Sequence, residues 1–202
     1  MAMRDAKRNY IIDNATALFL EKSMSDVTIR DIAKSSGVGE ATIYRLFSSR
    51  RELVVSCALK LQEKIGEKFL HSDRFSIGYT RLYLFYNAYL DVFENSPELY
   101  CFLSEFDAYC INENVTGLEE YSDNMDKFKN TFFEAYKDGI RDGSVRSVEH
   151  PELFYYSTTH AVLSLCKKLA AEGMIIRQDF ESDKSNEVRT LIDIILSALK
   201  NK

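Results

Sequence analysis

The segment from residue 27 to residue 53, VTIRDIAKSSGVGEATIYRLFSSRREL, restricts the fold of this chain most strongly, because it contains two short helical patterns joined by a tight turn. Thr28 is a favourable helix N-cap, and Asp31, three residues later, is a short substitute for the glutamate of a capping box. Ile29 and Ile32 then fall on one face at helical spacing. The pattern predicts a short amphipathic helix that begins after Thr28.

Gly37 marks the sharp turn between this helix and the next one. A left-handed backbone conformation costs energy for a residue with a Cβ atom, so glycine is favoured there. Residues 40–47 then form a second helical pattern that buries Ile43 and Phe47. Ala33 is small enough to let two helices cross closely, as a helix-turn-helix motif requires.

The second helix also leaves a face of short or polar side chains for another partner. Such a face can reach the base edges and phosphates of DNA. An ordinary helical hairpin inside a bundle is the alternative interpretation of the same pattern. The outward residues of the second helix are Glu40, Ala41, Thr42, Tyr44 and Arg45.

The run TIRDIAKSSGVGEATIYRLFSSRREL resembles the N-terminal domain of the TetR family of bacterial transcriptional regulators. The resemblance depends on G-V, on T-I-Y-x-x-F, and on the basic residue and E-L that follow. It covers roughly the first fifty residues, and the remainder is similar to the family only in length and helical character. Two positions depart from the family pattern: Gly39 stands where Ser often caps the recognition helix, and Leu46 stands where Tyr or His is common.

The resemblance implies an all-α fold in two domains. We expect a three-helix, helix-turn-helix DNA-binding domain in residues 1–48 and a larger helical domain for effector binding and dimerisation in residues 49–202. The implied function is that of a homodimeric repressor that a small-molecule ligand releases from a double-stranded DNA operator. An activator with the same DNA-binding head and a helical protein-binding module are the alternatives.

The expected DNA contacts divide into backbone contacts and base contacts. Glu accepts a hydrogen bond from cytosine, Arg binds guanine, and Ala contacts a thymine methyl group, so Glu40, Ala41 and Arg45 are assigned to base edges. The basic residue at the start of the next helix contacts phosphate in the family, and the resemblance gives that role to Arg50. Thr28, Arg30, Gly39, Thr42 and Tyr44 complete the predicted DNA-binding set. Arg4, Lys7 and Arg8, near the N-terminus, are either a solvated face or further phosphate contacts.

Charge is distributed unevenly along the chain. The whole sequence has a net charge of −5, which by itself does not favour nucleic acid as a partner. Residues 1–53, however, contain nine Lys or Arg against seven Asp or Glu, whereas the remainder contains 17 against 24. A mildly basic N-terminal part on an acidic body is consistent with a protein that contacts DNA at one end.

The rest of the chain predicts helices from apolar spacing and from proline and glycine positions. Pro97 and Pro151 each begin a helix, and Ser48 or Ser49 caps a long one that runs to about residue 70. The other expected helices cover residues 4–22, 76–94, 97–112, 118–142, 151–171 and 183–199, with loops at 23–26, 72–75 and 174–182.

The second domain is rich in aromatic residues at helical spacing, most of which are expected in a core. Tyrosine needs a hydrogen-bond partner for a buried hydroxyl group, so some tyrosines are candidates for lining a cavity between helices. The predicted effector-binding residues are Tyr83, Tyr86, Phe102, Phe106 and Tyr136.

Two helices near the C-terminus have apolar stripes wider than a single core face requires. Pairing of these helices with their copies in a second subunit would form a four-helix bundle at a two-fold interface. Burial within one subunit is the alternative. The predicted interface residues are Val162, Leu165, Leu169, Leu191, Ile192, Ile195 and Leu199.

No other pattern indicates an enzyme, a cofactor or a metal centre. The three histidines are far apart in the sequence, and the four cysteines lack C-x-x-C spacing. No signal peptide and no long apolar run is present, so we expect a cytoplasmic protein with reduced thiols and no membrane partner. These residues are His71, His150, His160, Cys57, Cys101, Cys110 and Cys166.

Overall fold

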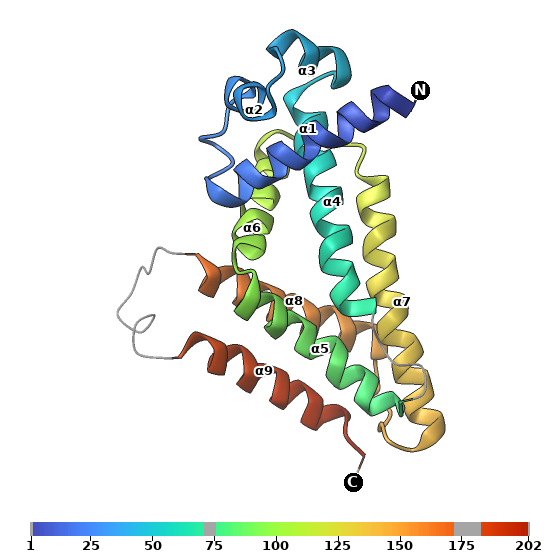
Figure 1. The fold of residues 1–202 in the computed structure, drawn as a ribbon. Helices are drawn as coiled ribbons and strands as arrows, with labels where there is room; N and C mark the ends of the chain where they lie inside the picture. The colour runs from blue at the N-terminus through green and yellow to red at the C-terminus, as the bar shows by residue number, and fades with distance from the viewer. Residues whose placement is uncertain (1, 71–75, 172–182, 202) are drawn as a thin grey trace. The chain divides into compact units, whose positions relative to one another are not determined.

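The computed structural model describes residues 2–70, 76–171 and 183–201, which form nine α-helices and no β-strand (Figure 1). This confirms the predicted all-α class. The helices are α1 (Ala2–Glu21), α2 (Ile29–Ser36), α3 (Glu40–Leu46), α4 (Arg50–Leu70), α5 (Gly78–Asn95), α6 (Glu98–Asn112), α7 (Glu119–Asp142), α8 (Pro151–Ala170) and α9 (Lys184–Leu199).

The predicted helix boundaries agree with these bounds to within two residues. Pro151 occupies the first turn of α8, as expected, whereas α6 begins one residue after Pro97. The α4 helix begins after Ser49, whose Oγ accepts a hydrogen bond from the backbone N–H of Glu52 at 3.2 Å. The loops predicted at residues 72–75 and 174–182 lie outside the described residues.

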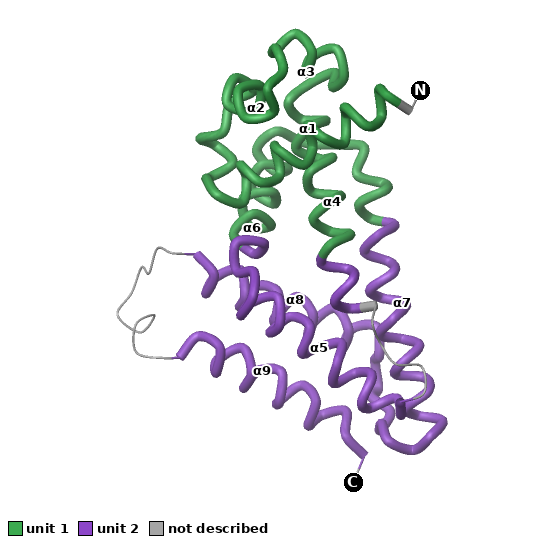
Figure 2. Tube along the Cα trace, viewed as in Figure 1, with its two compact units in different colours: residues 1–64, 101–122 green, residues 65–100, 123–202 purple. Residues whose placement is uncertain are grey.

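The chain divides into two compact units (Figure 2). Unit 1 contains residues 1–64 and 101–122, and unit 2 contains residues 65–100 and 123–202. Helices α4, α6 and α7 each contribute to both units. The predicted division at residue 48 concerns which part of the chain performs which function, and it stays a prediction.

In unit 1, the three N-terminal helices pack against one another around apolar side chains that are fully or almost fully buried. The α1 stripe contributes Ile11, Ala15 and Phe19. The Phe19 ring lies 6.3 Å from the ring of Phe102, which stacks on Phe106 at a centroid distance of 6.1 Å. The part of α6 that contains Phe102 and Phe106 therefore belongs to the same core as α1.

Unit 2 has an aromatic core that α5, α7 and α8 build together. The Phe85 ring lies 5.7 Å from Phe132, and Phe132 lies 5.1 Å from Tyr155. Tyr100 donates a hydrogen bond from its buried hydroxyl to the carbonyl oxygen of Tyr89 at 2.9 Å. Helix α9 packs on α5 and α8 in the same unit. Most of the aromatic residues of this unit therefore form a closed core.

The start of α5 lies unusually close to the end of α7. A Cβ atom built on Gly78 would be 2.0 Å from the backbone nitrogen of Gly139, a distance that no side chain tolerates. The residue before α5 provides no side-chain cap. Instead, the carboxylate of Asp142 accepts from the Gly78 N–H at 2.8 Å, and Ser144 Oγ accepts from the Tyr79 N–H at 3.1 Å. The α7 end thus caps α5 from a distant part of the sequence.

Three further observations concern the described residues only. None of their helices is both long and apolar enough to cross a lipid bilayer. They contain no group of three His, Cys, Asp or Glu residues arranged to hold a metal ion. All four cysteines lie among them without forming a disulfide, and burial raises the pKa of Cys57 and of Cys166 to about 12.

Candidate nucleic-acid interface

The first helix of the candidate interface, α2, begins with the predicted capping box. Thr28 Oγ1 accepts from the backbone N–H of Asp31 at 3.2 Å, and the Asp31 carboxylate accepts from the backbone N–H of Thr28 at 2.9 Å. The same carboxylate accepts from the Thr28 hydroxyl at 2.5 Å. These hydrogen bonds, the side-chain bond first, lower the pKa of Asp31 below its ordinary value of 3.8. The carboxylate is therefore ionised at neutral pH and satisfies donors that the helix itself leaves free.

The turn after α2 takes the left-handed conformation predicted for Gly37. Its φ is 65° and its ψ is 26°, and its N–H donates to the carbonyl oxygens of Ala33 and Lys34. The N–H of Val38 also donates to the Ala33 carbonyl, at 3.1 Å. The turn thus satisfies the last carbonyls of α2 and fixes the direction in which α3 leaves.

Helix α3 has seven residues and one buried face. Ile43, Leu46 and Phe47 are each 9% exposed or less. Its N-cap, Gly39, makes no side-chain hydrogen bond, and only its carbonyl oxygen binds the helix, at 2.8 Å from the Thr42 N–H. Packing against α1 and α2 therefore holds α3 more than its own cap does.

The opposite face of α3 is open to solvent and gathers most of the predicted DNA-binding residues. Tyr44 is 55% exposed, and Thr42 is half-buried. An open groove of about 670 Å³ lies between α2 and α3, lined by Arg30, Asp31, Ala33, Lys34, Val38, Gly39 and Glu40. The exposed members of the predicted set are Thr28, Arg30, Gly39, Glu40, Ala41, Tyr44 and Arg45.

The side chain of Arg50 is half-buried and has partners within unit 1. Its Nη2 atom donates to the carbonyl oxygens of Met24 at 2.5 Å and Val27 at 3.3 Å, in the loop that precedes α2. Its guanidinium carbon lies 5.6 Å from the ring centroid of Tyr109. The sequence offered no signal for these contacts, because all three partners are far from Arg50 along the chain.

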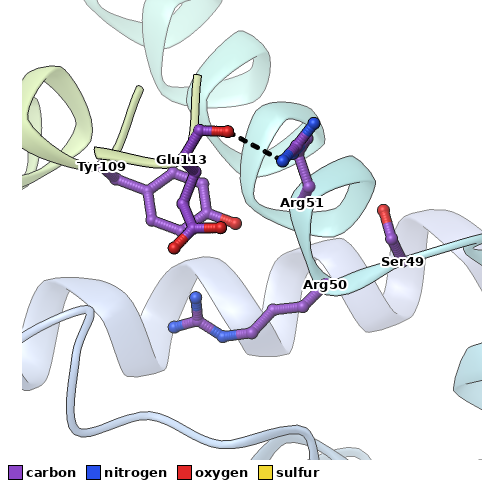
Figure 3. A pocket seen from close by; sticks show the side chains of 5 residues that line it. All are labelled: Ser49, Arg50, Arg51, Tyr109 and Glu113. Carbon is purple, nitrogen blue, oxygen red and sulfur yellow. Dashed lines mark hydrogen bonds between the residues drawn. The ribbon is translucent and has the colours of Figure 1, made fainter. Parts of the chain in front are cut away.

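Arg50 also borders a small open pocket of about 430 Å³, lined by Ser49, Arg50, Arg51, Tyr109 and Glu113. Figure 3 shows that the two arginine side chains point in different directions. Arg51 donates from Nη2 to the carbonyl oxygen of Glu113 at 2.9 Å, whereas Arg50 extends towards the loop before α2. The two adjacent positive charges therefore hold different segments of unit 1.

The five predicted effector-binding residues lie in both units. Tyr83, which is 45% exposed, Tyr86 and Tyr136 belong to unit 2, whereas Phe102 and Phe106 belong to unit 1. The Tyr86 hydroxyl is 2.6 Å from the Thr158 hydroxyl, and the Tyr136 hydroxyl accepts from the Val148 N–H at 2.9 Å. These two tyrosines therefore have the protein partners that buried hydroxyl groups need.

The predicted dimer residues are mostly buried inside this single chain. Leu165 and Leu191 are half-buried. The other five side chains are each 5% exposed or less: Val162, Leu169, Ile192, Ile195 and Leu199. Ile194, on the outer side of α9, is instead 61% exposed. The inner face of the two stripes contributes to the core of unit 2, and only the outer face is accessible to another molecule.

Comparison with known proteins finds similar sequences, some that match the N-terminal helices and one that matches most of the chain. Residues 11–57 match the family model of bacterial regulatory proteins, tetR family. The HTH-type transcriptional regulator AlkX of Mycobacterium tuberculosis is 30% identical over 94 residues, which are 46% of this chain and 42% of that protein. The HTH-type transcriptional repressor KstR2 of Rhodococcus jostii is 23% identical over 154 residues, 75% of this chain and 74% of the repressor.

Solved structures resemble the chain over nearly its full length. A TetR-family transcriptional regulator from Agrobacterium tumefaciens has a TM-score of 0.73 at 12% identity and covers 98% of this chain and 99% of its own. The ketosteroid transcriptional regulator KstR2 of Mycobacterium tuberculosis has a TM-score of 0.66 at 16% identity, over 96% and 95% of the two chains. At these identities the structural likeness establishes the fold alone.

Proposed function

Because this chain belongs to the TetR family of transcriptional regulators, we propose that it is a homodimeric repressor that a small molecule releases from a DNA operator. The observation that carries the proposal is the exposed polar face of α3, which Ile43, Leu46 and Phe47 anchor from the buried side. A short helix presented in this way has the dimensions that the major groove of B-DNA admits.

The exposed residues of this face receive different roles in recognition. Glu40, Ala41 and Arg45 read base edges in the major groove. Thr28 and Arg30, at the start of α2, hold the sugar-phosphate backbone together with Thr42 and Tyr44 of α3. Their positions support these roles, because Thr28, Arg30 and Tyr44 are exposed and Arg30 lines the groove between α2 and α3.

Arg50 contributes a phosphate contact in addition to its internal hydrogen bonds. A guanidinium group has five N–H donors in a planar fork. Two carbonyl partners, those of Met24 and Val27, both accept from Nη2. The half-buried position of Arg50 at the first turn of α4 leaves the group close to solvent, where it can also meet a phosphate.

Dimerisation places two recognition helices in successive major grooves, roughly 34–36 Å apart. The outer faces of α8 and α9 supply the contact, with Leu165 and Leu191 at its edge. Exposed apolar side chains on the same two helices support this location, since Leu153, Tyr156 and Ile194 are 63%, 42% and 61% exposed. An effector that binds the body then weakens DNA binding only by the difference between its affinities for the two arrangements of the heads.

The test begins with selection of duplexes from genomic fragments by the wild-type protein, followed by gel-shift titration across a salt series. Arg45→Ala should change the preferred sequence, whereas Arg50→Ala should weaken all sites and reduce the salt slope by about one. A wild-type protein that retains no duplex would refute the proposed function.

Transcript measurement in a deletion strain then separates a repressor from an activator. Raised transcription of neighbouring genes supports the repressor, and lost transcription supports an activator with the same DNA-binding head. A thermal-shift screen of small molecules addresses the effector, because a ligand that binds only the native state raises its stability by mass action.

A further inference from the structure

The side chain of Arg8, on α1, contacts both the C-terminal end of α3 and the helix that follows it, α4. Its Nη1 atom donates to the carbonyl oxygen of Leu46, the last residue of α3, at 2.8 Å. Its Nη2 atom donates to Ser56 Oγ of α4 at 3.1 Å. The same guanidinium pairs with Glu52 at 2.8 Å and lies over the Phe47 ring, 4.2 Å from the centroid. One side chain thus contacts α3, α4 and the turn between them.

We propose that Arg8 is a positioning residue for DNA recognition, which fixes the C-terminal end of α3 and thereby aims its exposed face. This inference rests on the proposed function of α3 as the recognition helix. Arg8 acts through Leu46 and the turn, and it does not itself need to touch DNA.

A residue that fixes the end of α3 matters because this helix is not stable without contacts to the rest of the protein. A helix of seven residues is well below the length at which an isolated helix is stable in water. Its N-cap, Gly39, supplies no side-chain bond, and its last carbonyl oxygens have no partner within the helix. The hydrogen bond from Arg8 to Leu46 provides one of those missing partners with a charged donor, which is stronger than a neutral one.

Glu52 extends the same network to the backbone of the turn. Its carboxylate accepts from the Ser48 N–H at 2.7 Å and from the Ser48 hydroxyl at 2.8 Å, while its other oxygen pairs with Arg8. Burial alone would raise the pKa of Glu52, but the hydrogen bonds from Ser48 and Arg8 lower it below 4.5 overall. The carboxylate is therefore charged at neutral pH, and it holds Arg8 and the turn together.

The geometry requires arginine in particular. Donors on two different nitrogen atoms reach Leu46 and Ser56, while the plane of the group covers Phe47. A lysine ammonium group carries the same charge but is a compact point charge without this planar fork. Charge retention alone should therefore not restore the position of α3.

A direct phosphate contact by Arg8 is the competing role, and salt dependence separates the two. Loss of a phosphate contact weakens specific and non-specific binding together and reduces the salt slope by about one. Loss of a positioning residue lowers affinity for the preferred duplex more than affinity for a random one. Simple loss of folded protein would lower both affinities by the same factor, so the specific-to-non-specific ratio detects positioning alone.

The test compares Arg8→Met, which keeps an apolar stem over Phe47, with Lys7→Met, which removes one exposed charge from the same helix. Both are titrated with the selected duplex and a random duplex across a salt series. We expect Arg8→Met to reduce the specific-to-non-specific ratio at least about tenfold, a loss of about 1.4 kcal/mol in discrimination. Lys7→Met should leave the ratio within about twofold, and Arg8→Lys should not restore it.

Other results overturn the inference. An unchanged specific-to-non-specific ratio in Arg8→Met would show that Arg8 does not position α3. A salt slope reduced by about one in Arg8→Met, together with full recovery in Arg8→Lys, would assign Arg8 to phosphate binding. If Arg8→Met does not fold, Glu52→Gln serves as the second variant, and an unchanged ratio there refutes the network. A wild-type protein that binds no duplex refutes the proposed function and this inference with it, whereas a bound wild type with unaffected variants refutes the inference alone.

Discussion

The turn between α2 and α3 contains two glycines with different backbone conformations, and substitution of each should have different consequences. Gly37 has φ of 65°, whereas Gly39 has φ of −76° and ψ of 148°. A Cβ atom added at either position would meet no heavy atom within 4 Å. Comparison of Gly37→Ala with Gly39→Ala therefore isolates the backbone conformation from crowding.

The magnitudes follow from the two conformations. Alanine in the left-handed region costs about 1–2 kcal/mol, while restriction of the unfolded chain returns about 0.4–1 kcal/mol. Gly37→Ala should thus lower the free energy of unfolding by roughly 1 kcal/mol. At Gly39 the same gain in stability is offset by a loss of roughly half a kcal/mol, because alanine is a poorer N-cap than glycine. The free energy of unfolding of Gly39→Ala should therefore be close to that of the wild type.

Equilibrium urea unfolding, followed by far-ultraviolet circular dichroism, measures this difference. Gly37→Asn offers a matched intermediate, because asparagine adopts the left-handed conformation more readily than alanine. We expect the loss of stability to rise from Gly39→Ala through Gly37→Asn to Gly37→Ala. Equal destabilisation at the two glycines, or a neutral Gly37→Ala, would refute the argument that the left-handed turn fixes the path between α2 and α3.

Two further predictions concern packing and pH. Gly78→Ala would place a methyl carbon 2.0 Å from the Gly139 nitrogen and should lower the free energy of unfolding by about 1–3 kcal/mol. Gly66→Ala, whose nearest contact is at 3.6 Å, should raise it by up to about 1 kcal/mol. The opposite ranking in urea unfolding would contradict the close contact at Gly78. The pKa of Asp31 is lower in the folded state than its ordinary 3.8, because Thr28 binds the charged form. The contribution of Asp31 to stability is therefore complete above about pH 4 and declines as the pH falls below that value. Asp31→Asn should remove this decline from a profile of urea midpoint against pH. An unchanged profile would show that the capping box does not contribute to stability.

Much of the helix-turn-helix was predictable because its determinants are local. The cap at Thr28, the turn at Gly37 and the buried face around Ile43 depend on residues within a few positions of each other. Local signals of this kind survive in any tertiary context that accepts the motif. The predicted helix ends in the rest of the chain agreed for the same reason, since proline and apolar spacing act within one or two turns.

The partners of long side chains were not predictable, because tertiary packing brings them together. The sequence predicted a phosphate contact for Arg50 and either a solvated face or a phosphate contact for Arg8. In the structure, these two arginines bind the Met24 and Leu46 carbonyls, which lie 26 and 38 residues away. The apolar stripe of α9 likewise did not reveal which neighbour covers it. Ile192 is fully buried against the chain's own helices, and no periodicity distinguishes that burial from a subunit interface.

Photo-crosslinking tests most directly whether α3 is the surface that meets DNA. Tyr44 on α3 is 55% exposed and Ile140 on α7 is 40% exposed, so each can be replaced by p-benzoylphenylalanine without loss of a buried group. The two proteins are irradiated with the selected duplex and with a random duplex. We predict covalent attachment to the selected duplex from position 44 and none from position 140; crosslinks from position 140 alone, or equal yields from both positions, would contradict recognition by α3.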